Sequence, residues 1–93
     1  MINLNEIPDN KGKVINVNGK KVAFFKSKGK VHAFSTTCPH KGCDVDWNDT
    51  DNTWDCPCHG SRFESGGKLK KGPATKGLDK LDVEIKGKEI IIK

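Results

Sequence analysis

Two loops decide how this chain is organised: Cys38-Pro39-His40-Lys41-Gly42-Cys43 and Cys56-Pro57-Cys58-His59-Gly60-Ser61. Together they hold all four cysteines and two of the three histidines of the chain. Both contain proline and glycine, which fix backbone turns rather than extend strands or helices. We therefore expect two rigid loops that offer sulfur and imidazole to one metal site.

The spacing of the ligands separates two kinds of metal site. The first loop offers Cys38 and His40, two positions apart, and the second offers Cys56 and His59, three positions apart. Two thiolates with two imidazoles suit zinc or iron–sulfur chemistry. Zinc fingers with two cysteines and two histidines place the cysteines on one arm and the histidines on the other. Here each arm carries one of each, which favours a two-iron centre with both sulfurs on one iron and both nitrogens on the other.

Two cysteines remain after this assignment. Cys43 follows His40 by three positions, and Cys58 directly precedes His59. A bond between Cys43 and Cys58 would tie the two loops together, whereas the uncommonness of disulfides in the cytosol counts against it. Two thiols, or zinc ligands in a wider site, are the alternatives at this stage.

Length and composition predict one small domain, residues 1–93. The hydrophobic content of 33% is low for a self-sufficient core, so a metal or disulfide is expected to stabilise the fold. Net charge is +5, and Arg62 is the only arginine. We expect no nucleic-acid binding, because such surfaces usually combine arginine with aromatic residues, although a basic surface favours an acidic protein partner. With no signal peptide and no apolar run of ~20 residues, we expect a cytoplasmic monomer without a membrane span.

Strand patterns dominate the first third of the chain. Three strands are predicted, at 14–17, 21–26 and 31–34. The first two are joined by Asn18-Gly19, the dipeptide most typical of a two-residue hairpin turn. Residues 27–30 form the next turn. This segment is therefore expected to be an antiparallel meander.

The rest of the chain also predicts strands and turns. Residues 44–52 are expected to be an acidic, turn-rich loop, and 53–55 a short strand that leads into the second metal loop. The chain is expected to close with a hairpin of 81–85 and 89–92, in which Leu81, Val83 and Ile85 face inward. Overall we expect an all-β antiparallel sandwich or partial barrel with a small inserted subdomain at about 36–65.

The two loops resemble the cluster-binding boxes of Rieske iron–sulfur proteins. Gly72-Pro73-Ala74 resembles the proline loop of the same family, which covers the cluster from a third side. The resemblance extends over the whole chain and implies a Rieske-type β-sandwich or partial barrel with a [2Fe-2S] cluster. It further implies that Cys38 and Cys56 bind the inner iron, and that His40 and His59 bind the outer, solvent-edge iron.

The same resemblance assigns roles near the ligands. It implies that Cys43 and Cys58 form the disulfide of the higher-potential subgroup and that the Ser61 hydroxyl donates to a bridging sulfide. Two positions depart from the respiratory members: Phe63 stands where they usually have tyrosine, and Lys41 where they usually have leucine. The lost phenol predicts a reduction potential below the respiratory proteins and above the ferredoxins that lack the disulfide.

The function implied is one-electron transfer rather than catalysis by this chain. The protein is expected to act as a soluble ferredoxin or as the electron-transfer domain of a larger oxidoreductase, with a flavoprotein reductase, an oxygenase or a cytochrome as redox partner. Residues 45–48 and 53–56 resemble Rieske domains that are fused to flavin-dependent oxidoreductases. The alternative is a structural zinc-binding interaction module, which would be colourless.

Overall fold

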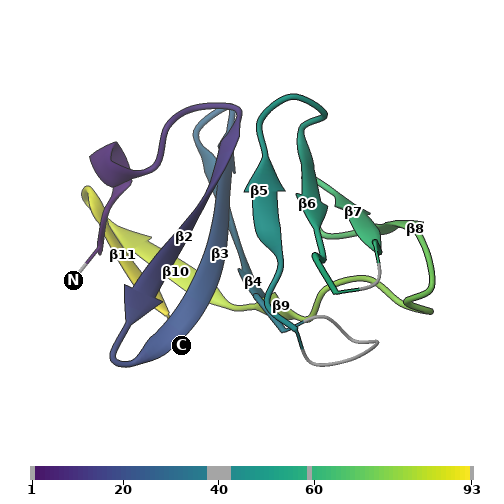
Figure 1. The fold of residues 1–93 in the computed structure, drawn as a ribbon. Helices are drawn as coiled ribbons and strands as arrows, with labels where there is room; N and C mark the ends of the chain where they lie inside the picture. Colours follow the sequence, from purple (N-terminus) through teal and green to yellow (C-terminus); the bar gives the residue numbers. More distant parts are fainter. Residues whose placement is uncertain (1, 38–42, 59, 93) are drawn as a thin grey trace.

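The computed structural model describes residues 2–37, 43–58 and 60–92, and these residues form three antiparallel sheets (Figure 1). The first sheet has the order β1-β11-β10, with β1 (Ile2–Asn3), β11 (Glu89–Ile92) and β10 (Val83–Lys86). The second has the order β2-β3-β4-β9, with β2 (Lys11–Val17), β3 (Lys20–Ser27), β4 (Lys30–Ser35) and β9 (Lys80–Leu81). The third has the order β5-β6-β7-β8, with β5 (Asp46–Asn48), β6 (Thr53–Asp55), β7 (Arg62–Glu64) and β8 (Leu69–Lys71). The all-β prediction is confirmed, and the one helical element among the described residues is a short 3₁₀ turn, η1 (Leu4–Glu6).

The predicted meander is β2-β3-β4. Asn18 and Gly19 both have positive φ, 52° and 85°, as the favoured two-residue hairpin turn requires. The Gly19 amide also donates to the Asn16 side chain at 2.9 Å. The next turn repeats the pattern, with φ of 52° at Lys28 and 76° at Gly29. The right-handed twist of paired strands matches such turns, so local sequence is enough to specify this part of the fold.

The second sheet lies between two hydrophobic clusters. Because successive side chains of a strand point to opposite faces, β3 supplies Ala23 to one cluster and Phe24 to the other. Their register partners on β4, Phe34 and Ala33, follow them to the same faces. The cluster shared with the first sheet consists of Ile2, Ile7, Val22, Phe24, Ala33 and Ile90. The cluster shared with the third sheet consists of Ala23, Phe34, Val45, Trp54, Cys56, Phe63, Ala74 and Leu78.

The closing hairpin differs from the prediction. The expected strand 81–85 is divided at Asp82: β9 pairs with β4, whereas β10 pairs with β11 in the other sheet. Leu81 and Val83 are half-buried, but Ile85 is 39% exposed, so its predicted inward position is wrong. Ile85 lies on β10, an edge strand of a three-stranded sheet, and is therefore covered less than its partner Ile90 on the central strand.

Two short strands were not predicted either. β5 lies within the expected acidic loop 44–52, and β8 follows the turn at 65–68. β5 is positioned by Trp47, whose ring lies 4.9 Å from Trp54 and 5.5 Å from Phe25, measured between ring centroids. These contacts connect the third sheet to the second. Neither strand has enough apolar residues of its own to be recognised without its partners.

The described residues contain no helix of the length and hydrophobicity that crossing a membrane requires.

Gly12 on β2 allows the second and third sheets to approach each other. A Cβ atom at this position would lie 2.5 Å from Trp47 and 2.6 Å from Trp54. Gly12→Ala should therefore lower the free energy of unfolding by about 1–3 kcal/mol, the usual effect of overpacking a core. Gly66 is the matched control, because its Cβ would meet no atom within 4 Å. Gly66→Ala should stay within about 0.5 kcal/mol of the parent protein. Denaturant unfolding of both variants measures the difference, and equal midpoints would contradict this role of Gly12.

Candidate metal centre

Of the four predicted ligands, the structure describes Cys56 but not the other three. Cys38, His40 and His59 lie outside the described residues, so their role as ligands stays a prediction. Cys56 is described and is 2% exposed. Lys41, at the predicted docking tip, also lies outside the described residues.

The second loop, residues 56–61, is a tight connection between β6 and β7. The Cys56 amide donates to the Ser61 carbonyl at 2.8 Å, and the Gly60 amide donates to the Cys56 carbonyl at 3.1 Å. Gly60 has a φ of +79°, a conformation that side chains rarely tolerate. Cys56 and Ser61 are thereby held together at the base of the loop, where both are buried.

The first loop is closed at its base in a similar way. The Val45 amide donates to the Thr36 carbonyl at 2.8 Å, and Thr37 and Asp44 form an isolated antiparallel bridge. The buried Thr36 hydroxyl donates to Asp44 at 2.9 Å. These bonds hold the two ends of the first loop, residues 36–37 and 44–45, close together.

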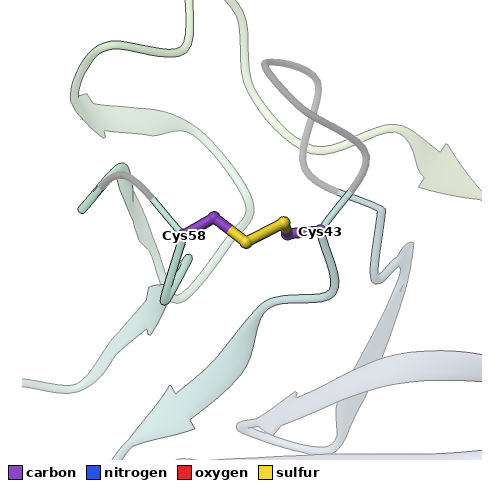
Figure 2. The surroundings of a disulfide bond; sticks show 2 residues. All are labelled: Cys43 and Cys58. Carbon is purple, nitrogen blue, oxygen red and sulfur yellow. A yellow bond between two sulfur atoms is a disulfide. The ribbon is translucent and has the colours of Figure 1, made fainter.

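A disulfide between Cys43 and Cys58 joins the two loops, as predicted (Figure 2). The two Cα atoms are 6.4 Å apart, within the usual range for such a bond. Cys43 is half-buried and Cys58 is exposed. In Figure 2 the two side chains point toward each other from separate segments of the chain. Each loop is thus tied to its own stem and also to the other loop.

Ser61 connects the second loop to residues 72–74, the predicted proline loop. Its side-chain oxygen accepts a hydrogen bond from the Ala74 amide at 3.0 Å. Because the oxygen is the acceptor in this bond, the hydroxyl hydrogen is available to a second acceptor. Ser61 is completely buried, and Ala74 lies in the same hydrophobic cluster as Cys56. The proline loop therefore lies beside the buried cysteine and orients the hydroxyl group.

Aromatic residues form an apolar floor beneath the second loop. Trp54 and Phe63 are both completely buried and face each other as register partners on β6 and β7. The Trp54 indole donates to the Ser65 carbonyl at 3.2 Å, which satisfies its only polar atom. Burial of large aromatic rings on both strands makes this floor rigid.

An ion-pair network fixes the stem of the second loop and was not predicted. Arg62, the residue after Ser61, lies 2.9 Å from Asp51 and 3.5 Å from Asp55, the residue before Cys56. The side-chain amide of Asn48 and the hydroxyl of Thr53 also donate to the Asp55 carboxylate, at 2.8 Å and 2.7 Å. The signal in the sequence was the run of aspartates at 44–55 together with the only arginine, which we had interpreted as a solvated turn.

Among the described residues, His32 and Asp49 have shifted pKa values, and both lie outside the two loops. Burial, followed by the charges of Lys80 and Lys30, lowers the pKa of His32 on β4. Hydrogen bonds from Trp47 and Lys11 lower the pKa of Asp49. His32 also stacks on Phe34, with ring centroids 6.4 Å apart. His32 is part of the second sheet.

The described residues fit an iron–sulfur cluster. A buried cysteine, a buried hydroxyl with its hydrogen available and two buried aromatic side chains lie together at the second loop and its stem. Sulfur ligands of such clusters are typically buried and hydrogen-bonded in this way. The disulfide places the first loop against the second, as a site that draws ligands from both loops requires.

Comparisons with known proteins give the same result. The family model described as Rieske [2Fe-2S] domain matches residues 1–82. The chain is 43% identical to YhfW of Bacillus subtilis (strain 168), whose name refers to a Rieske 2Fe-2S iron-sulfur protein, over 84 residues that make up 89% of this chain and 16% of YhfW. It is 39% identical to the cytochrome b6-f complex iron-sulfur subunit of Chlorobaculum thiosulfatiphilum over 87 residues, 94% of this chain and 48% of that subunit. The chain therefore spans about half or less of the length of these relatives.

Solved structures share the fold. The plasma membrane Rieske protein PetC3 from Synechocystis PCC 6803 superposes with a TM-score of 0.76 at 32% identity, over 88% of this chain and 85% of that one. A chain of a hyperthermophilic respiratory Complex III superposes with a TM-score of 0.80 at 23% identity, over 97% of this chain and 71% of that one, and so supports the fold alone. The zinc alternative gains no support from any of these matches. With a family model that covers most of its length, the chain belongs to the Rieske [2Fe-2S] domain family.

Proposed function

We propose that this chain transfers single electrons through a Rieske-type cluster bound by Cys38, His40, Cys56 and His59. When bound, such a cluster accepts and releases one electron without a change of ligands. The observation that carries the proposal is the pair of disulfide-linked loops, with Cys56 and Ser61 buried at the base of one of them.

The residues around the site have two tasks in this function. The first is to favour the added electron, which brings one negative charge to the site. A hydroxyl aimed at that charge stabilises the reduced state, and Ser61 has its hydrogen available for this purpose. The second task is to change shape little during transfer. The stem bonds, the disulfide and the Arg62 ion pairs all restrict movement of the loops. A preorganised polar environment keeps the reorganisation cost of such a charge change low.

We further propose that the physiological partner is another redox protein and that the chain works as the electron-transfer domain of a larger oxidoreductase. The match to only 16% of YhfW supports this proposal, because most of that relative lies outside the matched segment. A soluble ferredoxin is the second candidate. It is favoured by the superposition on the ferredoxin of carbazole 1,9a-dioxygenase from Nocardioides aromaticivorans IC177, which covers 91% of that chain, although its 22% identity supports the fold alone.

Metal content and spectroscopy test the function directly. Protein purified without oxygen should be red-brown, contain about two iron atoms and two acid-labile sulfides per chain, and take up one electron reversibly. The reduced form should give the electron paramagnetic resonance signal of a mixed-ligand two-iron cluster. A colourless protein with one zinc per chain would establish the zinc module instead.

Ser61→Ala should lower the reduction potential. The variant loses a buried donor that favours the reduced state, and a hydrogen bond to a charged group contributes about 1.5–3 kcal/mol. For a one-electron couple this corresponds to a decrease of about 60–120 mV. Redox titration followed by visible absorbance measures the shift. Thr75→Ala is the control, because Thr75 is exposed directly after the proline loop and its loss should leave the potential unchanged. A Ser61→Ala potential equal to that of the parent would exclude the proposed donor role.

Removing the disulfide should weaken retention of the cluster. Cys43 and Cys58 are separated by 15 positions, and closing a loop of that length stabilises a folded chain by about 3 kcal/mol in the chain-entropy model. Cys43→Ser with Cys58→Ser should therefore lose the cluster absorbance several times faster in a fixed concentration of denaturant. A thiol-free reductant should accelerate the loss in the parent protein and have no effect on the double variant. Identical decay in the two proteins would show that the disulfide does not hold the loops.

A further inference from the structure

One edge of the third sheet carries a run of lysines without acidic residues. Residues 65–78 contain four lysines and neither aspartate nor glutamate. All four side chains are exposed to solvent. We name this surface the basic edge and define it by its members: Lys68, Lys70, Lys71 and Lys76. β8, which supplies two of them, is the last strand in the order of its sheet.

The basic edge lies next to the proposed metal site. Lys71 is the register partner of Arg62, the residue that follows Ser61. Lys76 lies two positions after Ala74, whose amide donates to the Ser61 oxygen at 3.0 Å. Lysines thus precede and follow the segment that contacts the second loop. Positive charges at these positions attract or repel a charged protein that approaches the site.

Most aspartates on the opposite side of the sheet are paired with cations, although Asp46 on β5 forms no ion pair within the described residues. Asp44, Asp49 and Asp51 each have a cation within 4 Å, at 3.6, 3.4 and 2.9 Å. On the basic edge, Lys76 lies 3.5 Å from Asp79. The other three lysines form no ion pair with any residue in the described ranges. Glu64 on β7 also lies beside this edge, because its amide donates to the Lys68 carbonyl at 2.7 Å. Four lysines against Glu64 and Asp79 still leave a net positive charge on the β8 side.

Protection of an edge strand does not account for this arrangement. Lysines and bulges do discourage edge-to-edge pairing, and β7 and β8 are paired with a register shift. However, Lys68 and Lys76 lie outside the strand and protect no edge. Lys71 faces Arg62 across the pair, and like charges at opposed positions destabilise a sheet. The placement is better explained by attraction of a negatively charged surface.

We propose that the basic edge is the docking surface for a carboxylate-rich face of an acidic redox protein. This inference rests on the proposed electron-transfer function and adds the chemistry of the partner. Opposite charges on two proteins raise the association rate by 10-fold to about 1,000-fold, and salt abolishes the gain. Lysine suits this role because its charge is mobile and hydrated, which permits a fast, short-lived complex. An acidic partner that docks here is brought beside the loop that holds Cys56 and Ser61.

The test uses the cluster-loaded chain and a plant-type ferredoxin as the acidic protein probe. Such ferredoxins have potentials near −400 mV, so one electron passes from the reduced ferredoxin to the oxidised chain. Stopped-flow absorbance gives the second-order rate constant. For the parent chain it should fall at least 10-fold between about 10 mM and about 1 M salt, as the screening length shrinks from about 30 Å to about 3 Å.

Charge reversal locates the surface. K70E/K71E should lower the rate constant at least 10-fold at low salt, and K70Q/K71Q should give an intermediate value without placing an acid opposite Arg62. K28E/K88E is the matched control. It makes the same change in net charge at two exposed lysines, one in the turn between β3 and β4 and one in the turn between β10 and β11. The β3–β4 turn lies at the opposite end of β4 from the first loop. The control should stay within about twofold of the parent. With basic cytochrome c as acceptor for the reduced chain, K70E/K71E should instead be faster than the parent.

The outcomes separate the two proposals. If the chain accepts no electron from dithionite, the electron-transfer function itself fails. If the chain is reducible but the ferredoxin rate is independent of salt, there is no electrostatic docking. If K28E/K88E slows the reaction as much as K70E/K71E does, net charge rather than the basic edge controls association. Each of the last two results overturns the docking surface while the function stands.

Discussion

The packing of Trp54, Phe63 and Phe34 in one hydrophobic cluster is the constraint on which the site depends. Trp54 and Phe63 come from the strands on either side of the second loop, and Phe34 comes from the strand that leads into the first. All three side chains are essentially inaccessible to solvent. Their contact fixes the stems of both loops relative to each other, so the disulfide joins two segments that the core has already brought close. A low hydrophobic content is sufficient because the core is concentrated where the loops begin.

Ser61 connects the packing of the loop stems with the chemistry of the proposed site. The hydrogen bond from Ala74 occupies the oxygen of Ser61 and leaves its hydrogen available, and Ala74 itself belongs to the same hydrophobic cluster. The direction in which the hydroxyl donates is therefore set by backbone geometry and by packing rather than by a flexible side chain. Arg62 contributes in a different way, because its pairing with Asp51 and Asp55 joins the two ends of the second loop. Phe63 adds no donor of its own, so within the second loop and its stem Ser61 is the side-chain hydroxyl that we expect to adjust the potential.

The features that could be predicted from sequence are those whose cause is local. Asn18-Gly19 specifies a turn through the φ values that these residues tolerate, and the turn is present. The Cys43–Cys58 disulfide followed from a family resemblance and is confirmed. β5 and the division of the closing strand at Asp82 depend on partners distant in sequence, and alternation of side chains does not reveal them. The ligand roles of Cys38, His40 and His59 stay predictions, because these residues lie outside the described part of the chain.

The positions of the acidic and basic residues in the third sheet depend on each other. The sequence predicted a solvated loop at 44–52, but four of the five aspartates of 44–55 lie within 4 Å of a cation, two of them beside Arg62. With Arg62 engaged by Asp51 and Asp55, its charge is partly neutralised, and this reduces the repulsion that Lys71 meets on the neighbouring strand. The network that supports the second loop thus also permits lysines to gather beside it. One four-stranded sheet can thus be rigid on one side and attractive to a partner on the other. Most aspartates toward its β5 edge are paired with cations, whereas three of the four lysines of the basic edge form no ion pair within the described chain.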